Sequence, residues 1–212
     1  MVVDLPVPEL RDYRRINAEI ARHLDAGEIR VRLSGVEGQR LLLHGLAGPW
    51  DAIVEVEGDA GPELAAELDA PNLLVVCTGD AADGAGRHAR GGRLLILGTA
   101  GTATAYGLRG GSVVAAQATG PRAGLNLAGG SLVLLGPAGQ LAGERQSGGL
   151  IFARAEGLGP HAGRGRRGGG LICIRLAEES DLAEEIEPLR NALRGLEPWL
   201  GAGMSRWRPV DA

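Results

Sequence analysis

Short apolar runs recur at a nearly fixed interval through the middle of this 212-residue chain. Five of them closely follow a Gly-Gly pair and read RLLIL, SVVAA, SLVLL, LIFA and LICI. Aliphatic runs of four or five residues between glycines are typical of short, buried β-strands. Because the runs return in the same frame, the pattern predicts one repeated structural unit rather than a set of unrelated strands.

The glycine pairs give the period of this repeat. Successive pairs lie 19, 19, 19 and 20 residues apart. Glycine enters the positive-φ region without a steric penalty, so a pair of glycines suits a sharp corner of a coil. The sequence therefore assigns the coil corners to Gly91, Gly92, Gly110, Gly111, Gly129, Gly130, Gly148, Gly149, Gly168 and Gly169.

The repeat also has weaker units upstream and a second column of small residues. Residues 53–71 fit the same frame, with Ala70 and Pro71 in place of a glycine pair, and residues 28–45 fit as a longer version. About six to seven units then cover residues 28–175. The second column lies six residues before the second glycine of each pair and consists of Gly86, Ala105, Gly124, Gly143 and Gly163.

The length of the unit restricts the architecture. Ankyrin, tetratricopeptide and HEAT repeats each need two helices and a longer unit. A leucine-rich repeat would show a column of Asn or Cys, and the calcium-binding nonapeptide repeat a column of Asp, and the sequence has neither. A left-handed hexapeptide helix would have a period of about 18 residues. The sequence predicts an all-β fold, a right-handed parallel β-helix with one coil per repeat and strands stacked about 4.8 Å apart.

This stacking places the two cysteines of the chain in one column. Cys77 and Cys173 occupy the same strand position as Ile96 and Leu134. They are five coils apart, which is about 24 Å at the strand spacing, whereas a disulfide requires Cα atoms within about 7 Å. We therefore expect two unpaired core cysteines. Two are also too few for a disulfide scaffold or a zinc site.

The two ends of the chain depart from the repeat and show helical periodicity. Residues 9–25 place apolar side chains at helical spacing. Residues 180–196 do the same, with Ser180 or Asp181 as the N-cap and Pro188 as a point where the helix kinks or splits. Both helices are expected to cover the open ends of the solenoid.

The chain thus divides into an N-terminal helical cap at residues 1–27, the β-helix at 28–175, and a C-terminal helix with an extended tail at 176–212. The tail carries Trp199 and Trp207. An extended segment that bears Trp and Arg docks on a protein surface more often than it stays free in solvent. That surface is either the chain's own domain or a partner.

Arginines gather near the coil corners. Arg90, Arg109 and Arg167 share one column, directly before a glycine pair. One interpretation is a solvated basic face, and the other is a docking stripe for an acidic partner surface or an anionic ligand. The candidate partner-docking residues are Arg87, Arg90, Arg109, Arg164, Arg166, Arg167, Trp199 and Trp207.

Composition and charge argue against several functions. The chain has 36 Gly and only six aromatic residues, and all 22 basic residues are Arg. The absence of Lys excludes a P-loop lysine and a Schiff-base lysine. A net charge of −4 gives no reason to expect nucleic-acid binding, and no uninterrupted apolar stretch is long enough for a membrane span. We expect a cytoplasmic protein with no nucleic-acid or membrane partner.

Residues that could carry catalysis are sparse along the repeat. The only acidic residues between positions 93 and 175 are Glu144 and Glu156, which argues against the paired carboxylates of a glycosidase. The four histidines have no metal-ligand spacing. Residues 157–162, GLGPHA, match the dinucleotide fingerprint, but GRGRRGGG follows and cannot form the required helix. We assign no catalytic, cofactor-binding or metal-binding residue.

The order of a strand, Gly-x-x-Gly, small-Gly and x-x-x-Gly-Gly resembles the GXGXG domain, the right-handed β-helix at the C-terminus of the large subunit of glutamate synthase. The segment RDYRRINAEIARHL followed by EIRVRLSGVEGQRLLLHG also resembles the beginning of stand-alone forms of this domain. The resemblance covers about residues 11–175. The same domain occurs as a separate polypeptide of formylmethanofuran dehydrogenase and of the related formyltransferase/hydrolase complex, and in split N-methylglutamate synthase.

The resemblance implies a role without catalysis by this chain. In the family the β-helix carries no catalytic residue, and FMN and the iron–sulfur cluster lie on other domains. The implied function is that of a scaffold and docking subunit in a glutamate-synthase-type complex, in which amidotransferase-like and FMN-binding synthase-like subunits transfer ammonia from glutamine to 2-oxoglutarate. The alternatives are the β-helix component of a formylmethanofuran dehydrogenase or formyltransferase/hydrolase complex in one-carbon metabolism, and an independent enzyme that uses the β-helix groove. A homo-oligomer is also compatible with the sequence.

Overall fold

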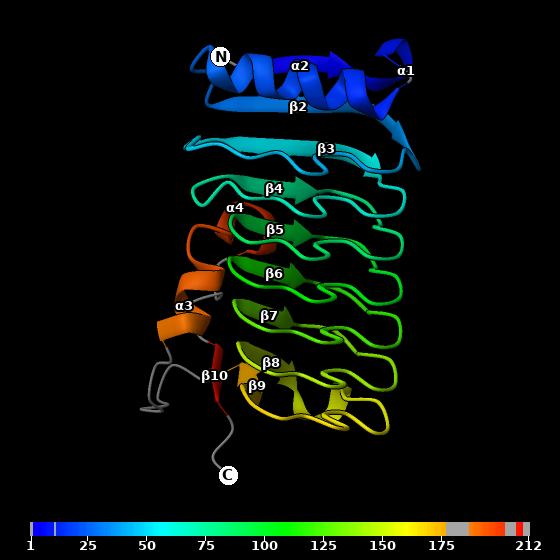
Figure 1. Cartoon of the computed structure of the whole chain (residues 1–212), viewed down its shortest axis with the longest axis vertical. Helices are drawn as coiled ribbons and strands as arrows, with labels where there is room; N and C mark the ends of the chain where they lie inside the picture. Colours follow the sequence, from blue (N-terminus) through cyan, green and yellow to red (C-terminus); the bar gives the residue numbers. More distant parts are fainter. Residues whose placement is uncertain (1, 11, 177–186, 202–206, 210–212) are drawn as a thin grey trace.

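Ten strands form one sheet in which their spatial order is their order along the chain (Figure 1). The structure is a computed structural model, and it describes residues 2–10, 12–176, 187–201 and 207–209. Each strand from β1 to β8 pairs in parallel with the next one, so the chain winds in successive coils into a solenoid of about seven turns. The prediction of a parallel β-helix is confirmed.

The strands of the coils are short and stay in register. Equivalent residues recur every 19 to 23 positions, as in the column from Arg30 through Ile53 and Leu74 to Arg93. The strands are β2 (Arg30–Glu37), β3 (Ile53–Asp59), β4 (Leu74–Cys77), β5 (Arg93–Ile96), β6 (Ser112–Ala115), β7 (Ser131–Leu134), β8 (Leu150–Arg154) and β9 (Gly170–Leu176).

Strands β3 to β9 contribute to two apolar clusters because alternate side chains point to opposite faces of the sheet. In β5, Leu94 and Ile96 point into the coil and belong to the inner core, whereas Leu95 belongs to a second cluster on the outer face. The C-terminal helices cover this outer face, with Leu189 and Leu193 among the buried residues. The middle of the sheet is therefore buried on both sides, which explains why β4 to β8 are short, mainly apolar runs.

The rest of each coil is a turn-rich segment with alternating left-handed residues, which we call the left-handed layer. In every coil three residues, two positions apart, have φ between +51° and +75°. The middle residue belongs to the small-residue column of the sequence in five of the seven coils. The members are Leu41, Leu43 and Gly45; Glu63, Ala65 and Glu67; Gly84, Gly86 and His88; Ala103, Ala105 and Gly107; Arg122, Gly124 and Asn126; Leu141, Gly143 and Arg145; and His161, Gly163 and Gly165.

Hydrogen bonds join the left-handed layer of one coil to the next as regularly as in a sheet. The N–H of Glu63 donates to the carbonyl of Asp83 in the following coil (2.9 Å), and the N–H of Glu67 donates to that of Arg87 (2.7 Å). The N–H between them, from Ala65, donates to Leu42 in the preceding coil (2.8 Å). The first and third donors thus point forward along the stack and the middle donor points backward.

The glycine pairs lie at the bend that leads into each strand, and the two members are needed for different reasons. Gly111 has a φ of +70°, which disfavours other residues. Gly110 has an ordinary φ, but a Cβ atom there would lie 2.2 Å from the carbonyl oxygen of Arg90 in the preceding coil. Close stacking of the coils therefore excludes a side chain at Gly110.

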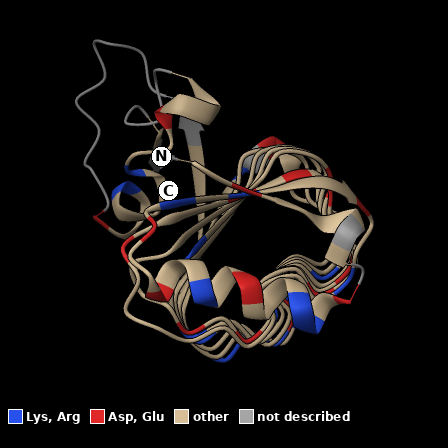
Figure 2. Cartoon of the chain, turned by 90° about the horizontal axis from the view of Figure 1, so that it is seen from above, with Lys and Arg blue, Asp and Glu red and all other residues tan. Residues whose placement is uncertain are grey.

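The N-terminal end is more than a helical cap. Strand β1 (Val3–Pro6) extends the sheet beyond β2, and the short helix α1 (Val7–Leu10) follows it. Helix α2 (Tyr13–Asp25) begins at Tyr13 rather than at residue 9, because the carboxylate of Asp12 accepts the N–H of Arg14 as an N-cap (3.0 Å). Seen end-on, the coils superpose and α2 lies across this end of the stack (Figure 2).

The C-terminal segment returns along the outer face of the sheet. Helix α3 (Glu187–Leu193) contains Pro188 near the start of its described part. The residues before it lie outside the described part of the chain, so the expected kink or split at Pro188 stays a prediction. The expected N-cap at Ser180 or Asp181 lies outside the described residues. A second short helix, α4 (Glu197–Leu200), follows, and β10 (Trp207–Pro209) pairs antiparallel with β9.

The cysteine column and the unpaired state of both thiols are as the sequence predicts, but only one of the two cysteines lies in the core. Register partners run from Cys77 through Ile96, Ala115, Leu134 and Ala153 to Cys173, and both thiols are free. Cys77 is fully buried, and burial raises the pKa of its thiol to about 11. Cys173 is only half-buried, because it lies in the last coil.

Candidate docking surface

The structure brings three of the predicted arginines together around His88. Burial lowers the pKa of His88, and the positive charges of Arg87, Arg109 and Arg90 lower it further. The imidazole lies against the ring of Tyr106, with centroids 4.9 Å apart. Arg87, Arg90 and Arg109 thus form one basic cluster on the left-handed layer, which we call the His88 cluster.

Arg87 is held in place by two neighbours. Its guanidinium lies 2.6 Å from a carboxylate oxygen of Glu63 and 5.6 Å from the ring centroid of Tyr106. These side chains and Asp83 line a surface hollow of about 290 Å³. Asp83 is also engaged, because it accepts the N–H of Thr102 (2.7 Å). The charged groups of the hollow thus already have partners within the chain. Arg90 and Arg109 are the exposed arginines of the His88 cluster.

The other predicted arginines form a separate cluster in the last coil. Arg164, Arg166 and Arg167 are all exposed. Arg167 shares the column of Arg109 but lies three coils further along, about 14 Å at the strand spacing. Ala128 and Ser147 occupy this column in between. The single stripe that the column suggests is therefore two clusters.

The sequence reasoning missed Arg145 as a member of the second cluster. Arg145 is exposed, and its side chain passes over the last coil, because a Cβ atom on Gly165 would lie 3.6 Å from its Cγ. It sits in the third left-handed column, which only coil-by-coil alignment of the turn segments would have revealed. We call Arg145, Arg164, Arg166 and Arg167 the last-coil cluster.

Charge is distributed unevenly along the stack. Residues 28–92 contain eleven acidic residues and five arginines, whereas residues 93–176 contain two acidic residues and nine arginines. The two acidic residues of the second part, Glu144 and Glu156, form ion pairs with Arg122 (3.2 Å) and Arg154. The solenoid is thus acidic toward its N-terminal end and basic toward its C-terminal end.

The two tryptophans proposed for docking pack on the chain itself. Both belong to the outer apolar cluster that covers the sheet. The indole N–H of Trp199 donates to Glu55 on β3 (3.3 Å), and Arg30 approaches the same carboxylate oxygen at 2.8 Å. The hydrogen bond from Arg30 holds the pKa of Glu55 below its usual range. The two tryptophans therefore pack on the chain's own domain.

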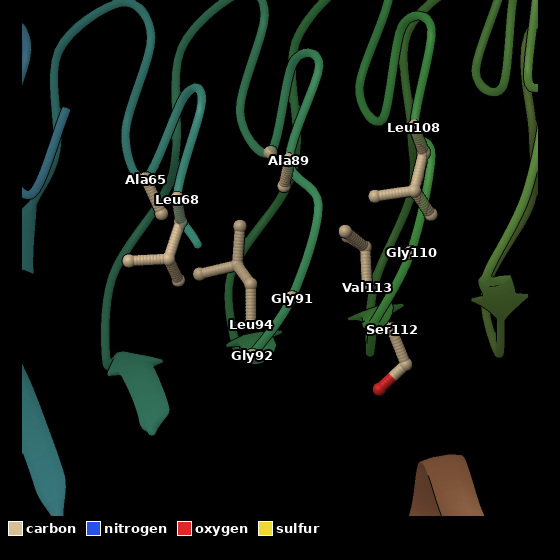
Figure 3. A pocket seen from close by; sticks show the side chains of 11 residues that line it. Ala65, Leu68, Ala89, Gly91, Gly92, Leu94, Leu108, Gly110, Ser112 and Val113 are labelled. Carbon is tan, nitrogen blue, oxygen red and sulfur yellow. The ribbon is translucent and has the colours of Figure 1, made fainter. Parts of the chain in front are cut away.

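The interior of the coils is filled by side chains. Between the coils that carry Leu68, Leu94, Leu108 and Val113 there is a cavity of about 10 Å³ (Figure 3). This volume is at the lower limit for one water molecule, and the walls are mainly apolar, so the cavity suits no ligand. Among the described residues, no group of three or more His, Cys, Asp or Glu side chains could hold a metal ion.

Comparison of the chain with protein-family models, with curated proteins and with solved structures gives no match. Within the described part of the chain, no helix is both long and apolar enough to cross a bilayer. The candidate functional site of the described chain is therefore the pair of arginine clusters on the stack of coils. Arginine offers planar, always charged donors for carboxylate or phosphate groups, so this surface suits recognition of an anion.

Proposed function

We propose that this chain is a non-catalytic scaffold subunit of a multi-subunit enzyme of the glutamate synthase type. The observation that carries the proposal is the repeat. The resemblance to the GXGXG domain rests on two of its features, the small-residue column and the glycine pairs. The small-residue column lies in the left-handed layer, and the glycine pairs lead into the strands. Each unit therefore uses these positions for the same structural purpose.

In this proposal the chain supplies a rigid, charged surface and other subunits supply the chemistry. Amidotransferase-like and FMN-binding synthase-like subunits would carry glutamine hydrolysis, FMN and the iron–sulfur cluster in the cytoplasm. The exposed arginines of the His88 and last-coil clusters would hold these subunits in register, because charge complementarity fixes orientation and selects partners. The buried core of the solenoid makes it a stiff spacer between them.

The test is purification of the tagged full chain from its own host under gentle conditions, followed by mass spectrometry of the accompanying chains. The proposal expects an amidotransferase-like chain and a flavin-containing chain in stoichiometric amounts, together with glutamine-dependent glutamate formation by the complex. A metallohydrolase-like partner would instead assign the chain to a one-carbon complex. Recovery of the chain alone at native expression levels would contradict both assignments.

A further inference from the structure

The two ends of the left-handed layer are finished in different ways. At the first coil the side chain of Asn17, on α2, replaces the missing preceding coil. Its amide oxygen accepts the N–H of Leu43 (2.8 Å) and its amide nitrogen donates to the carbonyl of Leu41 (2.9 Å). Asn17 thus takes the place of a preceding coil for the backward-pointing N–H of Leu43, and α2 covers this end.

The last coil has forward-pointing donors without a coil to receive them. In all six preceding coils the first and third left-handed residues donate their N–H groups to carbonyls of the following coil, as Leu141 does to Pro160 and Arg145 to Arg164 (both 2.9 Å). The corresponding donors are the N–H groups of His161 and Gly165. Within the described residues neither donates a hydrogen bond, and both residues are exposed.

The same end carries concentrated positive charge. Arg164, Arg166 and Arg167 lie on the last coil and the side chain of Arg145 passes over it. None of the four forms an ion pair with a described residue. Charged side chains at an open edge also prevent self-pairing of that edge. They leave it able to accept a chain of the opposite charge.

A second copy of this chain does not fit the open end. The C-terminal end of another copy carries the same arginines and would repel it. The N-terminal end of another copy is closed by Asn17 and α2.

A nucleic acid fits less well than a polypeptide. A long polyanion that crossed the last-coil cluster would meet the acidic part of the stack, where residues 28–92 carry six more acidic residues than arginines. A short acidic segment would not reach that far. Backbone carbonyls of a polypeptide also match the two N–H donors, because the equivalent N–H groups of the six preceding coils all donate to backbone carbonyls.

We infer that the open end of the last coil is a docking site for an acidic polypeptide segment of another protein. Its backbone carbonyls accept the N–H groups of His161 and Gly165, and its carboxylates pair with the last-coil cluster. The inference rests on the proposed function only in taking the segment to belong to a partner subunit. The binding itself can be measured on the purified chain.

The experiment uses fluorescein-labelled decaglutamate and the purified full chain in a fluorescence anisotropy titration at low salt. The triple variant R164Q/R166Q/R167Q is expected to bind at least about tenfold more weakly, because three facing charges are lost. The matched control R14Q/R15Q/R22Q removes three exposed arginines from α2 at the other end and should change affinity less than about twofold. Equal losses in both variants, or no loss in the first, would overturn the inference.

A second readout separates docking at the edge from diffuse attraction. In a two-dimensional NMR titration, the backbone amide signals of His161 and Gly165 should shift with the decaglutamate concentration, and their hydrogen exchange should slow. Unchanged signals at saturation would overturn the inference. So would displacement of the peptide by equimolar inorganic phosphate or duplex DNA, since either would mean a site for phosphate groups.

The chain's own acidic segment is the remaining occupant to exclude. Residues 177–186 contain five acidic residues. The variant E178Q/E179Q/D181N/E184Q/E185Q should bind decaglutamate within about twofold of the unaltered chain. Tightening of about tenfold or more would assign the site to this segment and overturn docking of a partner. Each of these results stands whether or not co-purification supports a glutamate-synthase-type complex.

Discussion

Residues in the left-handed conformation are the most demanding positions of this molecule. An L-amino acid pays about 1–2 kcal/mol to enter this region, yet thirteen non-glycine residues of the described chain occupy it, all in the left-handed layer. Leu43 and Ala65 are fully buried there. The regular hydrogen bonds between coils and the burial of these side chains offset the cost, so the environment and not the residue type decides the conformation.

The cost of the backbone conformation can be separated from the cost of crowding. Gly45→Ala places a methyl group at φ +66° with no atom within 4 Å, and we expect a loss of about 1 kcal/mol in the free energy of unfolding. Gly124→Ala adds a Cβ that would lie 2.8 Å from Cδ1 of Ile151, at φ +71°. We expect a loss of about 2–4 kcal/mol, because overpacking adds to the strain. Urea denaturation of both variants measures this, and equal losses would contradict the role of crowding.

His88 should make the stability of the protein depend on pH. Its pKa is lowered in the folded state, mainly by burial and next by Arg87, so the unfolded chain takes up the proton first as the pH falls. The stabilisation is complete above about pH 6.5, the ordinary histidine value, and is lost as the pH falls toward the lowered pKa. His88→Asn, which suits a positive φ, should flatten the change in melting temperature between pH 7.5 and 5.5. Parallel curves for both proteins would refute this.

At the scale of elements, the sequence predicts those that repeat and misses those that depend on a partner. Strands β4 to β8 follow from aliphatic runs behind glycine pairs. Strands β1 and β10 have only four and three residues, and they are strands because an unpaired sheet edge lies beside them. The sequence indicates the alternating left-handed residues only where they are glycine. Leucine and alanine do not favour a positive φ, so Leu41, Leu43 and Ala65 could not be predicted.

The arginine clusters of the candidate docking surface could also be predicted from the sequence only in part. The column of Arg90, Arg109 and Arg167 follows from the period of the strands. Its division into two clusters follows from the same period, because Ala128 and Ser147 separate Arg109 from Arg167. The contacts of Arg87 with Glu63 and Tyr106 do not follow, because other coils contribute these neighbours. The unpaired donors of the last coil are backbone groups, and no residue type marks them.

Asn17 should be decisive for the closure of the first coil. Asn17→Ala leaves the buried N–H of Leu43 without its partner, whereas the carbonyl of Leu41 still accepts the N–H of His44 (3.2 Å). We expect a loss of about 1–3 kcal/mol in the free energy of unfolding, which is the cost of one unsatisfied buried group. Ala18→Gln, on the exposed side of the same helix, should change it by less than about 0.5 kcal/mol. Similar losses from both substitutions would show that Asn17 acts only through the helix.

At the scale of the whole molecule, the coil is the unit of construction. Each coil touches its two neighbours through the same columns, and strand partners differ little from β4 to β8. In such a solenoid the stability is approximately the sum of the contributions of coils and of the interfaces between them. The sequence period alone was sufficient to predict this organisation.

A whole coil should therefore be removable, whereas half a coil should not. Deletion of residues 112–130 joins Gly111 to Ser131 and pairs Arg93 with Ser131 in place of Ser112, so all columns keep their register. We expect a folded protein with unchanged far-UV circular dichroism per residue and a lower melting temperature, because α3 loses its contacts with β6. Deletion of residues 112–121 shifts inward-facing residues out of their columns and should abolish the cooperative thermal transition. A cooperative transition in the second variant would contradict this view of the fold.

The strictly sequential order of the strands has a consequence for biogenesis. A coil needs only its predecessor to close, and that predecessor leaves the ribosome about twenty residues earlier. The nascent chain can therefore fold from the N-terminus onward, beginning on the platform formed by β1, α2 and Asn17, while later coils are still being translated. The arginine-rich coil emerges after the other coils, so the docking end is completed when the rest of the stack is already in place.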